Sequence, residues 1–361
     1  MYFVKSTRKA NIAIVGATGQ VGKIMRSILE EVVVAGLLPV NNVRFFASAK
    51  SAGKSHNFNH KRIVVEDLSK ANLEGIDIAI FSAGGNVSLE YAPKFAKAGA
   101  IVIDNSSAWR KDPDVPLVVA EVNPEDCSTE FIKKGIIANP NCTTMAAMPV
   151  LKVLHDNASM SRLIVSTYQA VSGAGVAGIH ELTRQTYSTK SPLELTVDGG
   201  INDVPSEMQV KFKRPIAFNV VPYAGDIVND GSLETDEEQK LRDESRKILH
   251  IPELLVSGTC VRVPVFSGHG LSINAEFERD ITPEIAIKLL SDSANKESII
   301  VDEIPTPRLA AGKNPSFVGR IRADQSAPKN KGLSMFIAND NLRKGAALNA
   351  LQIAGIVNSK Y

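Results

Sequence analysis

Cysteine is scarce in this sequence of 361 residues, which contains only three. Cys127, Cys142 and Cys260 cannot all pair with one another, and none of them belongs to a CxxC motif. Neither these thiols nor the six histidines stand at spacings typical of zinc ligands. The sequence therefore predicts free thiols in a reducing compartment and no metal site, and it raises the question of whether one thiol is reactive.

An excess of one charge and long apolar runs are absent as well. The 41 Lys and Arg residues nearly balance the 39 Asp and Glu residues, so nothing predicts a nucleic-acid partner. The longest apolar stretches, such as Val32 to Val40, are far shorter than the roughly 20 residues of a membrane-spanning helix. The first ten residues carry positive charge but lack the apolar core of a signal peptide. We therefore expect a cytoplasmic protein without a membrane partner.

The first 140 residues alternate short apolar runs with helical patterns. At about 150 residues per domain, the length predicts two domains, of which this alternation marks the first. Near-continuous Val and Ile runs separated by helices indicate a parallel sheet covered on both faces, which is a doubly wound Rossmann domain over residues 1–141. The predicted strands are 11–15, 43–48, 62–65, 76–81 and 100–104, and the predicted helices are 21–34 and 87–97.

The pattern changes after Cys142, where long strands and segregated helices predict an α+β domain with a mixed, largely antiparallel sheet over residues 142–340. A tight Ser-Gly-His turn is expected to join its last two strands, and Thr235 with Glu238 forms a capping-box pattern. The amphipathic segment 342–357 is expected to return to the first domain, to which we assign residues 341–361. The predicted strands are 163–170, 254–266 and 270–278, and the predicted helices are 143–155, 236–249 and 285–291.

A glycine-rich loop, Gly16-Ala-Thr-Gly19-Gln-Val-Gly22, directly follows the first strand and opens a helix. Such a turn lets the backbone approach a pyrophosphate, whose charge faces the free N–H groups of the helix. The alternative is a tight turn that needs glycine but binds no ligand. After the second predicted strand, Lys50 and Ser51 stand where an NAD site usually has an acid, so the sequence predicts NADP. The alternative here is that Lys50 is ordinary solvated surface.

Cys142 lies in the segment Asn139-Pro-Asn141-Cys142, between an apolar strand and the helix that starts at residue 143. A thiol at a helix N-terminus is expected to have a lowered pKa and to act as a nucleophile. The local N–H groups and the Asn141 amide could then hold an oxyanion. An inert packed thiol is the alternative, and it is our interpretation of Cys127 and Cys260.

A nucleophile of this kind needs an acid/base partner, for which His269 is the candidate. It lies in Ser-Gly-His-Gly between two predicted strands, on a turn of the type that carries catalytic groups. A loop histidine without a role is the alternative. The other five histidines lie in a polar loop or within and at the ends of predicted helices, and none has comparable surroundings.

Taken together, several segments resemble the aspartate-β-semialdehyde dehydrogenase family of the glyceraldehyde-3-phosphate-dehydrogenase-like group. They follow the family order over nearly the whole chain. The matching blocks are GATGQVG (16–22), SAGG (82–85), DNSSAWR (104–110), NPNCTT (139–144), QAVSGAG (169–175), TCVRVPV (259–265), GHG (268–270) and DNLRKGAA (340–347).

The resemblance implies the NADPH-dependent, reversible conversion of L-4-aspartyl phosphate to L-aspartate 4-semialdehyde and inorganic phosphate through a cysteine thioester. This reaction leads to lysine, threonine, methionine and diaminopimelate, and the implied enzyme is a homodimer formed through the second domain. The implied roles are nucleophile for Cys142, acid/base for His269, substrate positioning for Gln169, carboxylate binding for Arg262, amino-group binding for Glu237, and phosphate binding for Arg110 and Lys240. The implied cofactor contacts are Gly16, Thr18, Gly19, Gln20, Val21, Lys50, Ser51, Ser172, Gly173 and Asn341.

The residues themselves agree with these implied roles. Arg262 lies in an otherwise apolar strand, where an unpaired guanidinium is costly and a bound carboxylate would satisfy it. An internal salt bridge is the alternative. Glu237 and Lys240 lie three apart on one face of a predicted helix, either as a surface ion pair or directed into the site.

The sequence departs from the family pattern at three positions, none of which is the nucleophile or the base. Trp109 replaces the usual Phe, Lys50 the usual Arg, and Gly270 a frequent Ser. Related reductases of N-acetylglutamyl phosphate have glycine at the position of Asn141. Two alternatives to the implied reaction are an acyl-phosphate reductase or phosphorylating aldehyde dehydrogenase with another substrate, and a non-catalytic dinucleotide-binding relative. The full set of Cys142, Gln169, Arg262 and His269 argues against the second.

Overall fold

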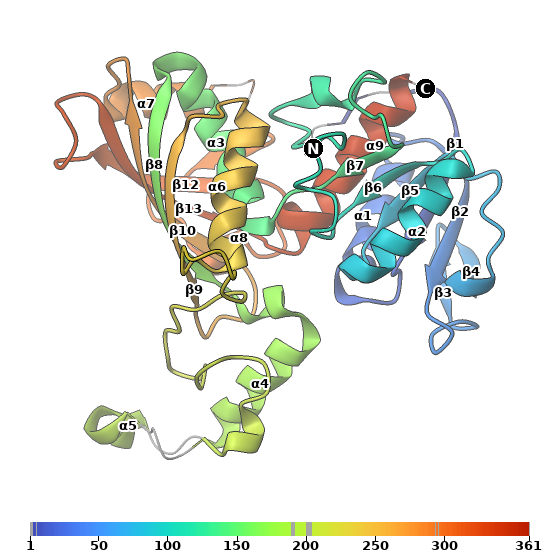
Figure 1. Cartoon of the computed structure of the whole chain (residues 1–361), viewed down its shortest axis with the longest axis horizontal. Coiled ribbons are helices and arrows are strands. Elements are labelled where there is room, and N and C mark those ends of the chain that lie inside the picture. The colour runs from blue at the N-terminus through green and yellow to red at the C-terminus, as the bar shows by residue number, and fades with distance from the viewer. Residues whose placement is uncertain are drawn as a thin grey trace.

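The chain folds into two β-sheets with helices packed against them (Figure 1). The computed structural model describes residues 3–4, 6–188, 192–199, 204–292, 294 and 296–360. The N-terminal part of the chain forms one lobe, and the part that follows Cys142 forms most of the other.

The first sheet has seven strands in the order β3-β4-β2-β1-β5-β6-β7. They are β1 (Ala10–Val15), β2 (Val40–Ala47), β3 (Ser55–Phe58), β4 (Lys61–Asp67), β5 (Ile78–Phe81), β6 (Ile101–Asp104) and β7 (Ile136–Ala138). All neighbours are parallel except β3 and β4, which pair antiparallel at one edge. The expected parallel sheet is confirmed. The sequence does not predict β3, because this strand is short and largely polar.

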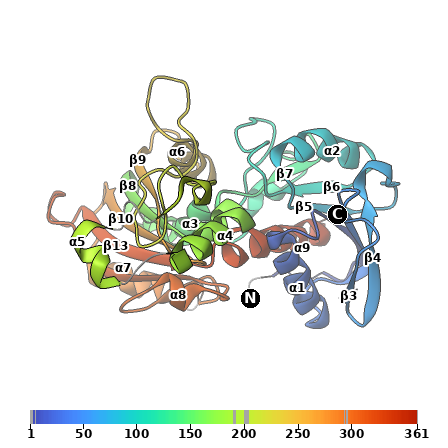
Figure 2. The ribbon, with the colours of Figure 1, turned by 90° about the horizontal axis from the view of Figure 1, so that it is seen from below.

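Helices cover both faces of the first sheet, as a doubly wound fold requires. The buried face of α1 (Gln20–Val34) presents Met25, Ile28, Leu29 and Val32, which recur at helical spacing. These residues and α9 (Asn349–Lys360) share one core with one face of the sheet, and α1 and α9 lie side by side in Figure 2. On the other face, α2 (Gly85–Lys97) packs through Phe95.

The second sheet has six strands in the order β11-β12-β13-β10-β8-β9. They are β8 (Met160–Gln169), β9 (Leu255–Arg262), β10 (His269–Phe277), β11 (Ile299–Val301), β12 (Ser316–Ala323) and β13 (Gly332–Asn339). The pairs β8–β9 and β11–β12 are parallel and the other pairs are antiparallel, so the expected mixed sheet is confirmed.

The expected hairpin between β9 and β10 is wrong, because β8 lies between these two strands. The strand β9 ends at Arg262, shortly before Pro264, which has no N–H to donate to a sheet. The following segment crosses the carboxyl end of β8, where the N–H of Val263 donates to the carbonyl of Gln169 at 3.1 Å. His269 is consequently the first residue of β10 and not part of a tight turn.

Three helices of the second lobe pack on one face of its sheet: α3 (Cys142–Ala158), α6 (Asp236–Leu249) and α7 (Pro283–Leu290). The capping box of α6 is present, with Thr235 and Glu238 bonded reciprocally. The sequence does not predict α4 (Gly175–Ser188) and α5 (Pro192–Asp198), which project as an arm from this lobe in Figure 1.

The C-terminal segment returns to the first lobe. Its first part, Arg343–Leu348, is a π-helix that continues directly into α9, so the single regular helix expected over 342–357 is only partly correct. π-Helical turns are rare and frequently occur at functional sites. Among the residues that the structure describes, no helix combines the length and the apolar character that crossing a membrane requires.

Candidate active site

The glycine-rich loop separates two cavities that together could hold a dinucleotide. One cavity of about 550 Å³ is lined by Thr18, Ser48 and other residues at the carboxyl ends of β1, β2 and β4. The other, of about 370 Å³, contains Cys142. Gly19 and Ser82 line both. A Cβ atom on Gly16 would lie 2.3 Å from the carbonyl oxygen of Ser82, so this turn requires glycine.

Several predicted cofactor residues line these cavities, and two do not. Gln20 and Val21 line the cavity with Cys142, and Gln20 Oε1 is buried without a hydrogen-bond partner among the described residues. Such an orphaned acceptor fits a site that a ligand completes. Lys50 and Ser51 follow Ala49 on the turn after β2, outside the residues that line the cavity at β2.

The candidate nucleophile, Cys142, is the first residue of α3, and Asn141 is the N-cap of this helix. The Asn141 side-chain oxygen accepts from the backbone N–H of Thr143 at 2.9 Å, which fixes the first turn. On the opposite side, a Cβ on Gly345 of the π-helix would lie 2.7 Å from Cys142 Cβ. The π-helix therefore packs directly against the nucleophile and has no room for a side chain there.

His269 is in contact with the thiol, with 3.2 Å between Nε2 and the Sγ of Cys142. Its other ring nitrogen, Nδ1, accepts a hydrogen bond from the backbone N–H of Ala170 at 3.0 Å. This bond assigns the hydrogen of the neutral ring to Nε2, which faces the sulfur. Burial and the positive charge of Arg262 hold the pKa of His269 well below its usual value, although the Gly268 carbonyl acts in the opposite sense.

The expected lowering of the Cys142 pKa is wrong for the free enzyme. Burial, assisted by the nearby Glu237 carboxylate, raises the pKa of the thiol to about 12. The cations Arg262, Arg110 and Lys240 oppose this rise without cancelling it. Burial disfavours a charged sulfur more strongly than these cations favour it. The resting pair is therefore a neutral thiol beside a neutral imidazole.

Alkylation of the free enzyme by iodoacetamide measures this directly. Because only the thiolate reacts, its rate at Cys142 is expected to rise about tenfold per pH unit between pH 7 and pH 10. Labelling of a Cys142→Ala variant supplies the background from Cys127 and Cys260. A plateau already near pH 7 would contradict the neutral pair and would restore the thiolate expected from the helix N-terminus.

Arg262 and Gln169 end neighbouring parallel strands and are paired in the sheet register. Both are buried. Arg262 Nη1 donates to the carbonyl of Ala170 at 3.1 Å, and across the described residues no carboxylate forms an ion pair with this guanidinium. The internal salt bridge is thus not found. Gln169 Nε2 is bonded to Thr167 along β8, and its buried Oε1 has no partner among the described residues.

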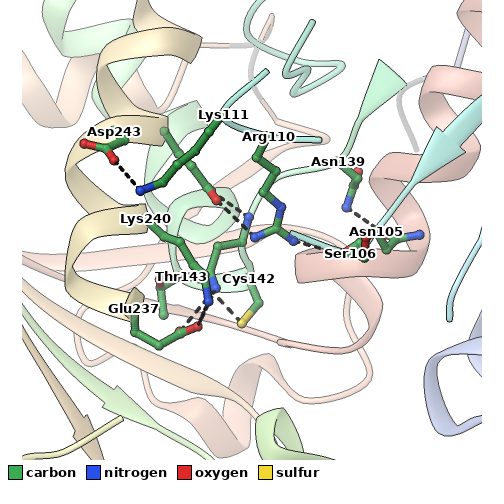
Figure 3. A network of polar contacts seen from close by, with 12 residues as sticks. Asn105, Ser106, Arg110, Lys111, Asn139, Cys142, Thr143, Glu237, Lys240 and Asp243 are labelled. Atoms are coloured by element: carbon green, nitrogen blue, oxygen red, sulfur yellow. Dashed lines mark hydrogen bonds and ion pairs between the residues drawn. The ribbon is translucent and has the colours of Figure 1, made fainter. Parts of the chain in front are cut away.

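Glu237 and Lys240 form a mostly buried ion pair at 2.9 Å, not a surface pair. The Asn141 amide donates to both oxygens of Glu237, at 3.1 and 3.2 Å. Figure 3 shows Glu237 and Lys240 beside Cys142. Burial acts to raise the pKa of Glu237, but Lys240 and the other nearby donors outweigh it, so the net pKa is lowered. Glu237 is therefore an ionised carboxylate within the site.

Arg110 reaches the same site from the loop after β6 (Figure 3). Its Nη2 donates to the carbonyl of Asn105 at 2.8 Å, and its Nη1 donates to Glu244 at 3.0 Å. The Nε of Arg110 is buried without a partner among the described residues. The neighbouring Trp109 donates its indole N–H to Ser88 at 2.9 Å, a bond that the usual Phe could not make.

The last predicted contacts form one small network. Asn341 accepts from the N–H of Gly268 at 2.9 Å and donates to the hydroxyl of Ser172 at 3.0 Å. A Cβ on Gly173 would lie 2.7 Å from the guanidinium of Arg262 and 3.4 Å from the His269 ring. The structure thus brings these residues together around the thiol.

Three residues of this site are assigned no role from the sequence. Glu244 bonds both Arg110 and the backbone N–H of Asn141, but its position on α6 is that of an ordinary charged helix residue. Gly345 is one of 25 glycines. Asp67 lines the cavity at the end of β2, although its carboxylate is already bonded to the N–H and the hydroxyl of Ser69.

Comparison with known proteins agrees with this arrangement. Residues 11–130 match the family described as "Semialdehyde dehydrogenase, NAD binding domain", and residues 151–344 match "Semialdehyde dehydrogenase, dimerisation domain". The fold and the site thus define a dehydrogenase of the semialdehyde dehydrogenase class, with a nicotinamide dinucleotide as its cofactor and a domain that forms homodimers.

Individual relatives narrow this class to one family. Aspartate-semialdehyde dehydrogenase of Mycolicibacterium smegmatis is 56% identical over 96% of this chain and 98% of its own length. The Streptomyces akiyoshiensis enzyme is 58% identical over 96% and 98%. A crystal structure of aspartate semialdehyde dehydrogenase II from Vibrio cholerae, complexed with ASA, is 39% identical with a TM-score of 0.88, covering 98% of this chain and all of that one. The chain belongs to the aspartate-semialdehyde dehydrogenase family.

Proposed function

We propose that this enzyme converts L-4-aspartyl phosphate reversibly to L-aspartate 4-semialdehyde, with NADPH as the reductant and inorganic phosphate as the second product. The observation that carries the proposal is the contact of 3.2 Å between Cys142 and His269, at one end of a pair of cavities of dinucleotide size. Buried groups suited to a carboxylate, an ammonium group and a phosphate lie around this contact. The product feeds the biosynthesis of lysine, threonine, methionine and diaminopimelate.

The substrate's three charged groups match three groups of the protein. Arg262 has no carboxylate partner among the described residues and is proposed to bind the α-carboxylate through two parallel hydrogen bonds. The ionised Glu237 is proposed to bind the ammonium group. Arg110, whose Nε has no partner among the described residues, and Lys240 are proposed to bind the phosphate. Gln169, whose Oε1 accepts no hydrogen bond within the described part of the chain, is proposed to position the substrate.

The thiol of Cys142 is proposed to attack the acyl carbon and to form a thioester, while the C–O bond to phosphate breaks. The thiol proton is proposed to pass to the departing phosphate, which leaves as hydrogen phosphate, so that the sulfur attacks as a thiolate. The Asn141 amide and the Nε2–H of His269 stabilise the oxyanion. Bound NADPH would supply the hydride that reduces the thioester. His269 then stabilises the thiolate by hydrogen bonding as the C–S bond breaks, and the sulfur takes up a proton from solvent.

NADP is the proposed cofactor because Asp67 is the one acid among the described residues that line the cavity at β2, whereas Lys50 and Ser51 directly follow the lining residue Ala49. The carboxylate of Asp67 is engaged by Ser69. We expect kcat/KM with NADP to exceed that with NAD at least about tenfold, since a lysine and a hydroxyl suit a 2′-phosphate. Parallel steady-state assays with the two cofactors measure this ratio, and equal values would contradict the choice.

Replacement of Arg262 by lysine is expected to raise the KM for aspartate semialdehyde roughly 10- to 100-fold with a smaller change in kcat, because a point charge replaces a fork that binds both oxygens. Steady-state kinetics at saturating NADP measure both constants. Arg162→Lys is the matched control, since this exposed strand arginine pairs with Glu276 away from the site. An unchanged KM would mean that Arg262 only anchors the Ala170 carbonyl.

We further propose that residues 1–141 with 341–361 form the cofactor-binding domain and that residues 142–340 form the catalytic domain. We also propose a cytoplasmic location, because a catalytic thiol must remain reduced. The reaction is tested by phosphate-dependent reduction of NADP with aspartate semialdehyde, glyceraldehyde 3-phosphate and N-acetylglutamate semialdehyde. Preference for the first aldehyde, with no turnover when phosphate is omitted, is the expected result. Preference for another aldehyde would overturn the substrate assignment.

A further inference from the structure

Glu244 is a buried carboxylate that joins two parts of the active site. It lies on α6 and is 3% exposed. Its Oε1 accepts from Arg110 Nη1 at 3.0 Å, and its Oε2 accepts from the backbone N–H of Asn141 at 2.7 Å. One side chain thus holds both the proposed phosphate-binding arginine and the residue that precedes the nucleophile.

The guanidinium of Arg110 is fixed from two sides and open on a third. Glu244 holds Nη1, the Asn105 carbonyl holds Nη2, and Nε has no partner among the described residues. Arg110 lines the cavity with Cys142 and also a neighbouring cavity of about 510 Å³, which Glu244 and Lys240 line too. Arg110 therefore lies between the two cavities, and Glu244 lines the neighbouring one.

The charge of Glu244 has a consequence for an anion bound to Arg110. Without phosphate, the carboxylate compensates the buried guanidinium, which would otherwise be costly. With phosphate bound, the same carboxylate lies close to a dianion and repels it. Glu244 therefore orients Arg110 while it weakens the attraction of this site for phosphate.

We propose that Glu244 is the positioning residue of the phosphate site, which holds Arg110 and the Asn141 backbone in the geometry for phosphate departure and keeps phosphate affinity low enough for release. This inference rests on the proposed function. It assigns to one carboxylate two separable effects: its hydrogen bonds set the rate, and its charge sets phosphate affinity.

Two substitutions separate these effects. Glu244→Gln removes the charge. The glutamine side chain has one oxygen and one NH2 group, so where the two carboxylate oxygens accept from Arg110 and from the Asn141 N–H, its NH2 group would face one of these donors. This variant is expected to lower the Kd for inorganic phosphate about threefold to tenfold, because a like charge is removed, and to lower kcat roughly 10- to 100-fold, because the geometry is lost. Glu244→Asp keeps the charge but shortens the reach. It is expected to lower kcat to a similar extent without lowering the Kd for inorganic phosphate.

The measurements are titration of inorganic phosphate into the NADP-loaded full-length enzyme, steady-state kinetics and the thermal midpoint. Asp243→Asn is the matched control, because it removes a carboxylate from the same helix. The Asp243 carboxylate forms ion pairs with Lys111 and Arg242 but not with Arg110. The phosphate Kd and kcat of this control should stay within twofold of wild type. NADP affinity and the thermal midpoint should be nearly unchanged in Glu244→Gln.

The proposal is overturned if Glu244→Gln keeps near-wild-type kcat, or if its phosphate Kd rises together with a lower thermal midpoint, as a merely structural carboxylate would give. If Glu244→Gln does not fold, a Glu244→Asp variant with wild-type kcat overturns the proposal equally. Failure of the proposed function would look different, because the wild-type enzyme would then bind phosphate and yet not turn over aspartate semialdehyde.

Discussion

Replacement of Cys142 by alanine is expected to lower kcat by roughly 10⁴- to 10⁶-fold, the range found when an enzyme loses its nucleophile. No other described thiol can substitute for it, because Cys127 and Cys260 are buried away from the two cavities. Cys142→Ser should lose nearly as much, since an alkoxide is far harder to form than a thiolate. Steady-state assays in both directions measure the loss.

Cys127→Ala is the matched control for this variant. Burial raises the pKa of Cys127 to about 12 as well, so the two thiols differ in their surroundings rather than in acidity. The control enzyme should retain kcat within a few-fold. NADP affinity should be unchanged in both. Near-wild-type turnover by Cys142→Ala would eliminate the covalent mechanism.

Replacement of His269 by asparagine is expected to lower kcat about 10²- to 10³-fold, the loss typical when a donor to a developing oxyanion is removed. In the wild-type enzyme, Nε2 of His269 lies 3.2 Å from the Sγ of Cys142, and asparagine is too short to bring a donor to this position. NADP affinity should not change. His60→Asn is the control, because His60 is an exposed residue with a φ of 62°, which asparagine tolerates.

His269→Gln distinguishes a hydrogen-bond donor from a group that must take up a proton. The ring's Nδ1 is already an acceptor for Ala170, so the structure supports Nε2–H as a donor to sulfur and oxyanion. Glutamine can present an N–H at greater reach and should therefore retain at least about tenfold more activity than asparagine. Equal losses in the two variants would indicate that proton uptake by the ring is essential.

The local features of the site are those that the sequence predicts best. The glycine loop follows its strand directly, and Cys142 follows its N-cap Asn141, so each depends on neighbours in sequence. The parallel pairing of β1 with β2 and of β5 with β6 is predictable in the same way, because α1 and α2 connect these neighbouring strands. The strand pairing of the second sheet is not, because the segment after Pro264 crosses β8 and separates β9 from β10.

Contacts between distant segments account for what the sequence could not show. Arg110 meets Glu244 across 134 positions, and Gly345 packs on Cys142 from a π-helix whose sequence resembles a regular one. The helix N-terminus alone predicts a lowered pKa for Cys142, which is the wrong direction, because the burial that raises this pKa depends on all the surrounding segments. These properties exist only once the two lobes are packed together.

The central claim is an acyl group carried by Cys142, and peptide mass analysis tests it most directly. The enzyme is incubated with aspartate semialdehyde and NADP without phosphate, quenched in acid and digested. The account predicts an aspartyl adduct on the peptide that contains Cys142, which disappears when phosphate is added before quenching. An unmodified Cys142 peptide, or an adduct on Cys127 or Cys260 alone, would contradict it.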